Sequence, residues 1–151
     1  MFKPFVFSWL LLFCFFNLFA SNGILKDKVV FVFKDDVVTE SDLRAFSFIL
    51  NIPLAERESL LAKVVEIEKS YYCLKENYPF EGEFLKEFPG VFYQFNLLKG
   101  NRFVVSDDLK KYDIDFEILK QNLFKLLFVV KYSLLLDDGS DCIRQPVFFV
   151  N

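Results

Sequence analysis

The stretch VVFVFKDDVVTESDLRAF, residues 29–46, limits most strongly how this chain can fold. Its first five residues are β-branched or aromatic, which favours a strand, and the charged residues 34–36 favour a tight turn. Two valines then begin a second strand that cannot run far, because Thr39 is a good helix N-cap with Asp42 three positions on. The pattern predicts a hairpin that leads directly into a helix.

Most of the chain after this hairpin has the apolar periodicity of amphipathic helices. Apolar residues recur at helical spacing over 43–50 and again over 53–77, where Pro53 suits the first helical position. The aromatic stretch 80–101 is interrupted by Pro89-Gly90. We therefore expect two separate helical pieces there, one on each side of this break.

The last helix and the C-terminus complete the predicted fold. Asp115 should cap a helix that extends to about Leu136, and its apolar part, 123–136, should be buried nearly all round. Val147–Val150 is a short apolar strand that cannot persist alone, so it should return and pair with Val29–Phe33. The predicted fold class is mainly α, with a small β-sheet formed by the N-terminal hairpin and the C-terminal strand.

The N-terminal residues have the pattern of a targeting segment. Residues 5–20 are almost all apolar and follow the positive start of Met1 and Lys3, which is typical of a signal peptide and short for a membrane span. Residues 1–20 are therefore predicted to be a signal peptide, with an uncleaved anchor as the alternative. Residues 21–151 are then long enough for a single exported, periplasmic domain, or for one tethered to the membrane by residues 5–20.

The absence of histidine, the net charge and the cysteines exclude or disfavour several classes of function. The chain has no histidine, which removes the commonest general base and the commonest metal ligand, so we expect no enzyme, no metal site and no cofactor. The net charge of −3 and the lack of a basic block argue against a nucleic-acid partner. Cys73 and Cys142 follow the leader, and the alternatives for them are a disulfide or two buried free thiols.

Aromatic residues are unusually frequent. Fifteen of the 22 phenylalanines follow residue 20, which is more than a core of this size usually takes. Six aromatic residues gather in and just after 80–101: Phe84, Phe88, Phe92, Tyr93, Phe95 and Phe103. They are candidates for a groove that binds extended apolar chains, and plain core packing is the alternative for some or all of them.

The order of these elements resembles the N-terminal chaperone domain of SurA-type periplasmic folding factors. The resemblance is most specific in residues 28–46, where Val37-Val38-Thr39 and Ser41-Asp42-Leu43 fit the family's opening pattern. Residues 60–77 and 111–135 look like the family's second and last helices. Lys34 stands where the family often has Asn, and the chain has no room for the parvulin-type prolyl isomerase domains that SurA-type proteins usually carry.

The resemblance implies a chaperone module alone. It would bind unfolded or β-rich envelope polypeptides, outer-membrane protein precursors among them, without ATP and without covalent chemistry. It also implies that a C-terminal segment packs on the N-terminal domain. The alternative function is a structural or adaptor domain that binds one dedicated envelope partner. Such a domain could act as a homodimer.

Overall fold

The computed structural model describes residues 27–103, 106–137 and 139–151. In chain order its elements are β1 (Val29–Phe33), β2 (Asp36–Thr39), α2 (Glu40–Leu50), α3 (Arg57–Asn77), α4 (Glu81–Leu98), α5 (Ser106–Lys111), α6 (Phe116–Tyr132), the 3-10 helix η1 (Ser133–Leu135), α7 (Asp141–Arg144) and β3 (Phe148–Phe149). Within the described part, no helix is long and apolar enough to cross a membrane. Residues 1–20, with the predicted signal peptide or anchor, lie outside it.

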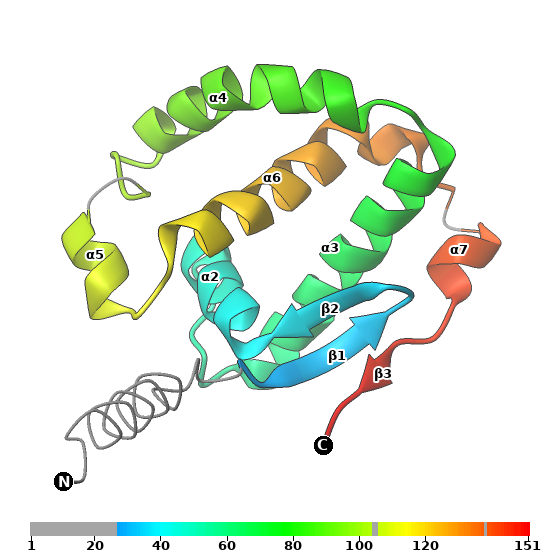
Figure 1. The fold of residues 1–151 in the computed structure, drawn as a ribbon, viewed down its shortest axis with the longest axis horizontal. Helices are drawn as coiled ribbons and strands as arrows, with labels where there is room; N and C mark the ends of the chain where they lie inside the picture. Colours follow the sequence, from blue (N-terminus) through cyan, green and yellow to red (C-terminus); the bar gives the residue numbers. More distant parts are fainter. Residues whose placement is uncertain (1–26, 104–105, 138) are drawn as a thin grey trace, which may run out of the picture.

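The predicted fold class is confirmed: the protein is mainly helical, with one small antiparallel sheet. β1 is the central strand, with β2 on one side and β3 on the other (Figure 1). The predicted return of the C-terminus is also confirmed, since Phe31 is paired with Phe149 and Val32 with Phe148. The regular part of β3 is shorter than the predicted strand 147–150, although the Val150 N–H still donates to the Val30 carbonyl at 2.9 Å.

The junction between hairpin and helix follows from local chemistry. β2 ends at Thr39 and α2 begins at the next residue. The Asp42 N–H donates to Thr39 Oγ1 at 3.4 Å, and the Thr39 N–H donates to Asp42 Oδ2 at 2.9 Å. This reciprocal capping box satisfies donors that the first turn of a helix otherwise leaves free.

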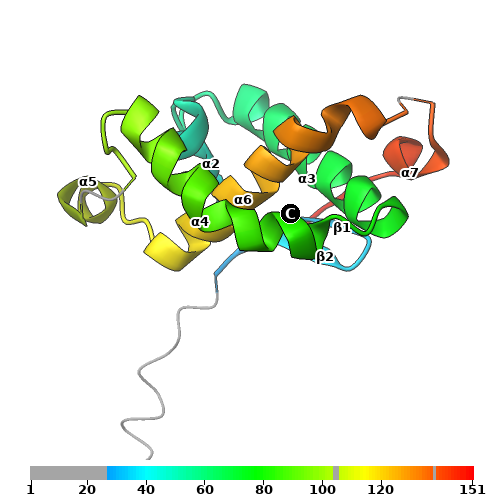
Figure 2. The ribbon, with the colours of Figure 1, turned by 90° about the horizontal axis from the view of Figure 1, so that it is seen from above.

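The helices are arranged around α6. Figure 1 shows α6 in the middle, with α4 on one side and α3, α2 and the sheet on the other, and Figure 2 shows α4 as an outer helix that lies across α6. Three buried apolar clusters fill the spaces between them. The first joins the sheet to α2 and α3, the second joins α2 and α5 to α6, and the third joins α3 and α4 to α6.

The predicted break at Pro89-Gly90 is wrong, because α4 is continuous from Glu81 to Leu98. Pro89 has no N–H to donate to the preceding turn, which normally weakens a helix. Here Pro89 and Gly90 are exposed, so water can reach the carbonyl left free, while Phe84 and Phe88 are buried on the inner side. Packing of the inner side therefore outweighs the local helix-breaking tendency.

Two further helix predictions need correction. α3 begins at Arg57 rather than Pro53, because residues 53–56 form a turn in which the Glu56 N–H donates to the Pro53 carbonyl at 2.9 Å. α6 ends at Tyr132, and its C-terminal part is not buried all round: Val130 is largely exposed. The elements that cover α6 leave one side of its last turn open to solvent.

A disulfide fixes the C-terminal segment. Cys73, near the end of α3, is bonded to Cys142 in α7, with the Cα atoms 5.9 Å apart. Of the two alternatives that the sequence left open, the structure therefore has the bridge. It closes a loop of 69 residues, for which loop-closure entropy gives a stabilisation of roughly 4 kcal/mol.

Deletion of residues 146–151 should lower the free energy of unfolding without abolishing folding. The deletion removes β3 and uncovers Phe31, which is fully buried. The removed side chains are themselves half exposed or more, at 66% for Phe148, 57% for Phe149 and 48% for Val150. We expect a loss of about 2–4 kcal/mol in urea unfolding, the value of one or two buried apolar side chains.

Phe148→Ser is the matched control, because it keeps the strand and changes a largely exposed side chain. It should cost less than about 1 kcal/mol. A truncated protein with the same urea midpoint and the same slope as the full chain would contradict this account of the sheet.

Candidate functional site

A cleft of about 530 Å³ lies between α4 and α6 and reaches α3. α4 lines it with Glu81, Gly82, Leu85 and Phe88, α6 with Glu117, Lys120, Gln121, Phe124 and Lys125, and α3 with Tyr71. The cleft exists because α4 contacts α6 through one face of large aromatic side chains, which hold the two helices apart.

One side of the cleft is an aromatic cluster. Phe124 lies against Phe84 and Phe88, with ring centroids 5.1 and 5.2 Å apart. Phe128 packs edge-on against both Phe84 and Tyr71 at 5.5 Å. Edge-on and tilted contacts of this kind are the favoured geometry for aromatic pairs, so the cluster gives this side of the cleft a firm apolar surface.

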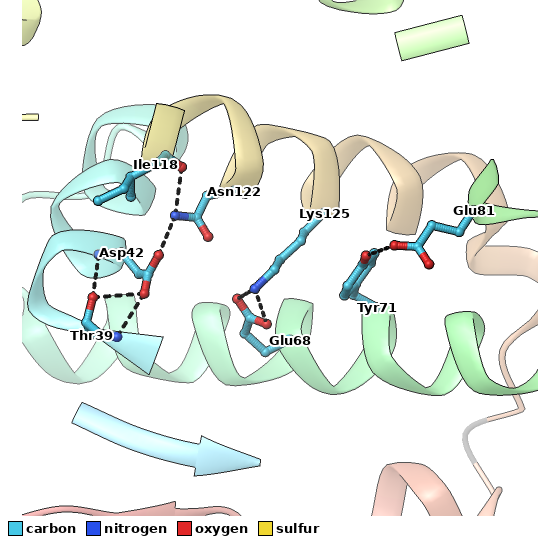
Figure 3. Close-up of polar contacts among 8 residues, drawn as sticks. All are labelled: Thr39, Asp42, Glu68, Tyr71, Glu81, Ile118, Asn122 and Lys125. Atoms are coloured by element: carbon cyan, nitrogen blue, oxygen red, sulfur yellow. Dashed lines mark hydrogen bonds and ion pairs between the residues drawn. The ribbon is translucent and has the colours of Figure 1, made fainter. Parts of the chain in front are cut away.

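Tyr71, which packs against this cluster, also joins α3 to α4 by a hydrogen bond. The Tyr71 hydroxyl donates to Glu81 Oε1 at 2.5 Å, as drawn at one end of Figure 3. Burial of Tyr71, and then its contact with the Glu81 carboxylate, raises the pKa of this phenol. Tyr71 therefore stays neutral, and because its one proton is donated to Glu81, its hydroxyl oxygen can only accept a further hydrogen bond.

A buried ion pair lies next to the cleft. Lys125 Nζ is 2.9 Å from both carboxylate oxygens of Glu68, which has no exposed surface (Figure 3). Burial raises the pKa of Glu68, and the facing Lys125 opposes that rise. The pair joins α3 to α6 and orients Lys125 along the edge of the cleft.

A second polar contact of α6 lies about one turn toward its N-terminus. Asn122 Nδ2 donates to Asp42 Oδ1 at 2.8 Å and to the Ile118 carbonyl at 3.0 Å (Figure 3). Asp42 is also the N3 residue of the capping box that begins α2. The position of α6, and with it one wall of the cleft, is thereby tied to the hairpin and its cap.

The six aromatic residues predicted as a binding group are divided between core and surface. Phe84, Phe88 and Phe103 are buried in the structure. Phe92 and Phe95 are half-buried, and Phe95 stacks on Phe103 at 5.5 Å. Phe88 is the member that lines the cleft, and Tyr93 is largely exposed on the outside of α4.

An apolar ridge continues from the cleft along the outside of α4. It consists of Leu85, Pro89, Tyr93 and Leu97, which are spaced four residues apart and are all exposed. Residues with this spacing lie next to one another on a helix surface. Leu85 belongs to both the ridge and the cleft, so the two form one apolar surface.

Sequence reasoning missed the residues that combine with Phe88 in this site. Leu85, Phe124 and Tyr71 look like ordinary core positions of their helices. Two charged residues at apolar positions could have revealed part of the site. Glu68 lies among the buried residues of α3, and Lys125 interrupts the most apolar part of α6. A carboxylate and an ammonium that both face a core are expected to pair.

Comparisons of the chain with protein-family models, with curated proteins and with solved structures give no match. The resemblance to SurA-type domains therefore stays a prediction. In residues 27–103, 106–137 and 139–151, no three His, Cys, Asp or Glu side chains are grouped to hold a metal ion. What the cleft offers is an aromatic surface edged by a hydroxyl, a lysine and carboxylates that already have partners, which suits an apolar side chain next to a polar backbone.

Lys125→Met should destabilise the protein in a pH-dependent way. It leaves the buried Glu68 carboxylate without its cation, which typically costs about 3–5 kcal/mol at neutral pH. The pKa of Glu68 then lies still further above its usual 4.5. The contribution of Glu68 to stability is largest below pH 4.5, the usual pKa of a glutamate. That contribution is lost as the pH rises toward the raised pKa of Glu68 in the folded protein.

The loss relative to wild type, measured by urea unfolding, should therefore be larger at pH 7 than at pH 4. The double variant Glu68→Gln/Lys125→Met removes both charges and should recover most of the stability. An equal loss at both pH values would show that Glu68 does not carry the effect.

Proposed function

We propose that this protein is an exported, ATP-independent chaperone-like domain that binds unfolded or β-rich envelope polypeptides, such as outer-membrane protein precursors. The observation that carries the proposal is the apolar surface formed by the cleft and the ridge of α4. The cleft volume of about 530 Å³ lies in the usual range for ligand pockets, and the ridge extends it along one helix. An extended chain can lay one apolar side chain in the cleft and others along the ridge.

The chemistry of the surface favours a sequence-tolerant ligand. Apolar and aromatic contacts are non-directional, and unfolded chains are the polypeptides that expose many apolar side chains. Most of the polar groups that line the cleft already have partners: Tyr71 is held by Glu81, Lys125 by Glu68 and Lys120 by Glu117. Such a surface selects for apolar character rather than for one particular sequence.

Export is supported by two observations. The apolar segment 5–20 has the length and flanks of a signal peptide. The Cys73–Cys142 disulfide is of the kind that persists in oxidising compartments such as the periplasm. The pattern of residues 28–46, which is the most specific part of the resemblance to SurA-type domains, supports the chaperone part of the proposal.

A variant with charges on the apolar surface should lose chaperone activity. Leu85→Glu/Tyr93→Glu changes two exposed side chains, one in the cleft and one on the ridge, so the fold should be kept. Loss of about 1.5 kcal/mol of apolar contact weakens binding by about tenfold. The concentration that suppresses aggregation of a urea-diluted outer-membrane β-barrel protein, followed by light scattering, should rise accordingly.

Leu134→Glu is the matched control, since Leu134 is 97% exposed and does not line the cleft. It should suppress aggregation as well as wild type. A photocrosslinking side chain at position 85 should also join to the client, and one at position 134 should not. If the doubly charged variant works as well as wild type, the surface assignment fails. If wild type suppresses no aggregation and forms a 1:1 complex with one envelope protein, the adaptor alternative holds.

A further inference from the structure

The C-terminal strand is attached to the sheet by few contacts, and of its segment Val147 packs against the core. β3 meets β1 through two residue pairs, and Val150 adds one hydrogen bond. Phe148 and Phe149 are more than half exposed, whereas Phe31 and Val30 beneath them are buried. A strand this short, with so little buried surface, is marginal without another constraint.

The edge that β3 covers belongs to the most buried strand of the protein. Val30 and Phe31 are part of the cluster that joins the sheet to α2 and α3. On its other side β1 is paired with β2 at four positions. The hairpin is therefore held by its own turn and by the core, and it presents a formed strand edge wherever β3 is absent.

The disulfide is the constraint that keeps β3 in place. Cys142 lies in α7, a short helix without buried residues, six positions before Phe148. It is half-buried, and a hollow of about 360 Å³ lined by Cys73, Asp137 and Ser140 lies beside the bridge. A small dithiol can therefore approach the bond.

We propose that the outer edge of β1 is a binding site for an extended, uncharged, apolar strand, which the C-terminal segment occupies until the Cys73–Cys142 disulfide is reduced. The resident segment shows which chemistry fits the edge. Residues 146–151 carry no charged side chain, consist mainly of valine and phenylalanine, and pair antiparallel to β1. A competing strand of the same character would take over the same backbone hydrogen bonds.

The release step is a thiol–disulfide exchange with a dithiol. One thiolate of the dithiol attacks Cys142 Sγ, the bond to Cys73 breaks, and Cys73 leaves as a thiolate that takes up a proton. The second thiol of the dithiol then attacks the mixed disulfide and releases Cys142, which also takes up a proton. Two electrons and two protons pass to the protein, and the dithiol becomes a disulfide.

The test uses a fluorescent peptide with the sequence QPVFFVN, residues 145–151, added to the full chain. Binding is followed by fluorescence anisotropy with oxidised wild type, with wild type plus dithiothreitol, and with Cys73→Ala/Cys142→Ala. The oxidised protein should bind at least about tenfold more weakly than the other two, because its own strand occupies the edge. A control peptide with Val150→Pro lacks the N–H that reaches Val30 and should bind weakly to all three.

Hydrogen exchange distinguishes release of the C-terminal segment from unfolding of the whole protein. In the reduced chain, amides of residues 141–151 should exchange at least about tenfold faster, while those of α2 and α6 keep their protection. Equal peptide binding before and after reduction, binding to neither form, or loss of protection throughout the protein would each overturn the proposal. The site is separate from the α4 surface, so Leu85→Glu/Tyr93→Glu should bind the peptide as wild type does, whatever its chaperone activity.

Discussion

The Asp42 carboxylate is the contact on which the arrangement of the other elements depends. Its Oδ2 accepts from the Thr39 N–H and from Thr39 Oγ1, both at 2.9 Å, and its Oδ1 accepts from Asn122 at 2.8 Å. One side chain thus ends β2, begins α2 and positions α6. Because each oxygen has a defined direction of approach, these bonds fix relative positions that apolar packing alone leaves loosely specified.

The ion pair of Glu68 and Lys125 has the same role one turn further along α6. The surrounding contacts between α3 and α6 are aromatic and aliphatic, and such contacts are non-directional. A buried carboxylate that loses its lysine in a shifted register makes that register unfavourable. Asn122 and Lys125, three residues apart on α6, therefore hold the helix against both α2 and α3 (Figure 3).

Features set by neighbours in sequence or by an unpaired strand edge could be predicted, and features that depend on how side chains pack between helices could not. The hairpin, the Thr39 cap and the return of the C-terminal strand follow from turn residues, capping chemistry and unpaired strand edges. The continuity of α4 through Pro89 does not, because it depends on Phe84 and Phe88 packing against α6. The same holds for the cleft, whose residues come from three helices and share no sequence motif.

The division of the aromatic residues shows how one helix serves both core and surface. α4 turns Phe84 and Phe88 inward and Leu85 and Tyr93 outward, so neighbouring positions have opposite exposure. An outer helix packed on one side only cannot bury both rows. The excess of phenylalanine seen in the sequence therefore goes largely into the aromatic core under α4, whereas the ridge that faces solvent is built from leucine, proline and tyrosine.

The apolar surface of the cleft and α4 and the edge of β1 are held by different contacts, although both involve α3. Tyr71 lines the cleft and Cys73, two residues on, holds the C-terminal segment. The contacts that set the distance between α3 and α6 are those of Asp42 with Asn122 and of Glu68 with Lys125, and neither includes a residue of the C-terminal segment. Detachment of β3 should therefore leave the walls of the cleft in place, because the contacts that position those walls belong to α2, α3, α4 and α6.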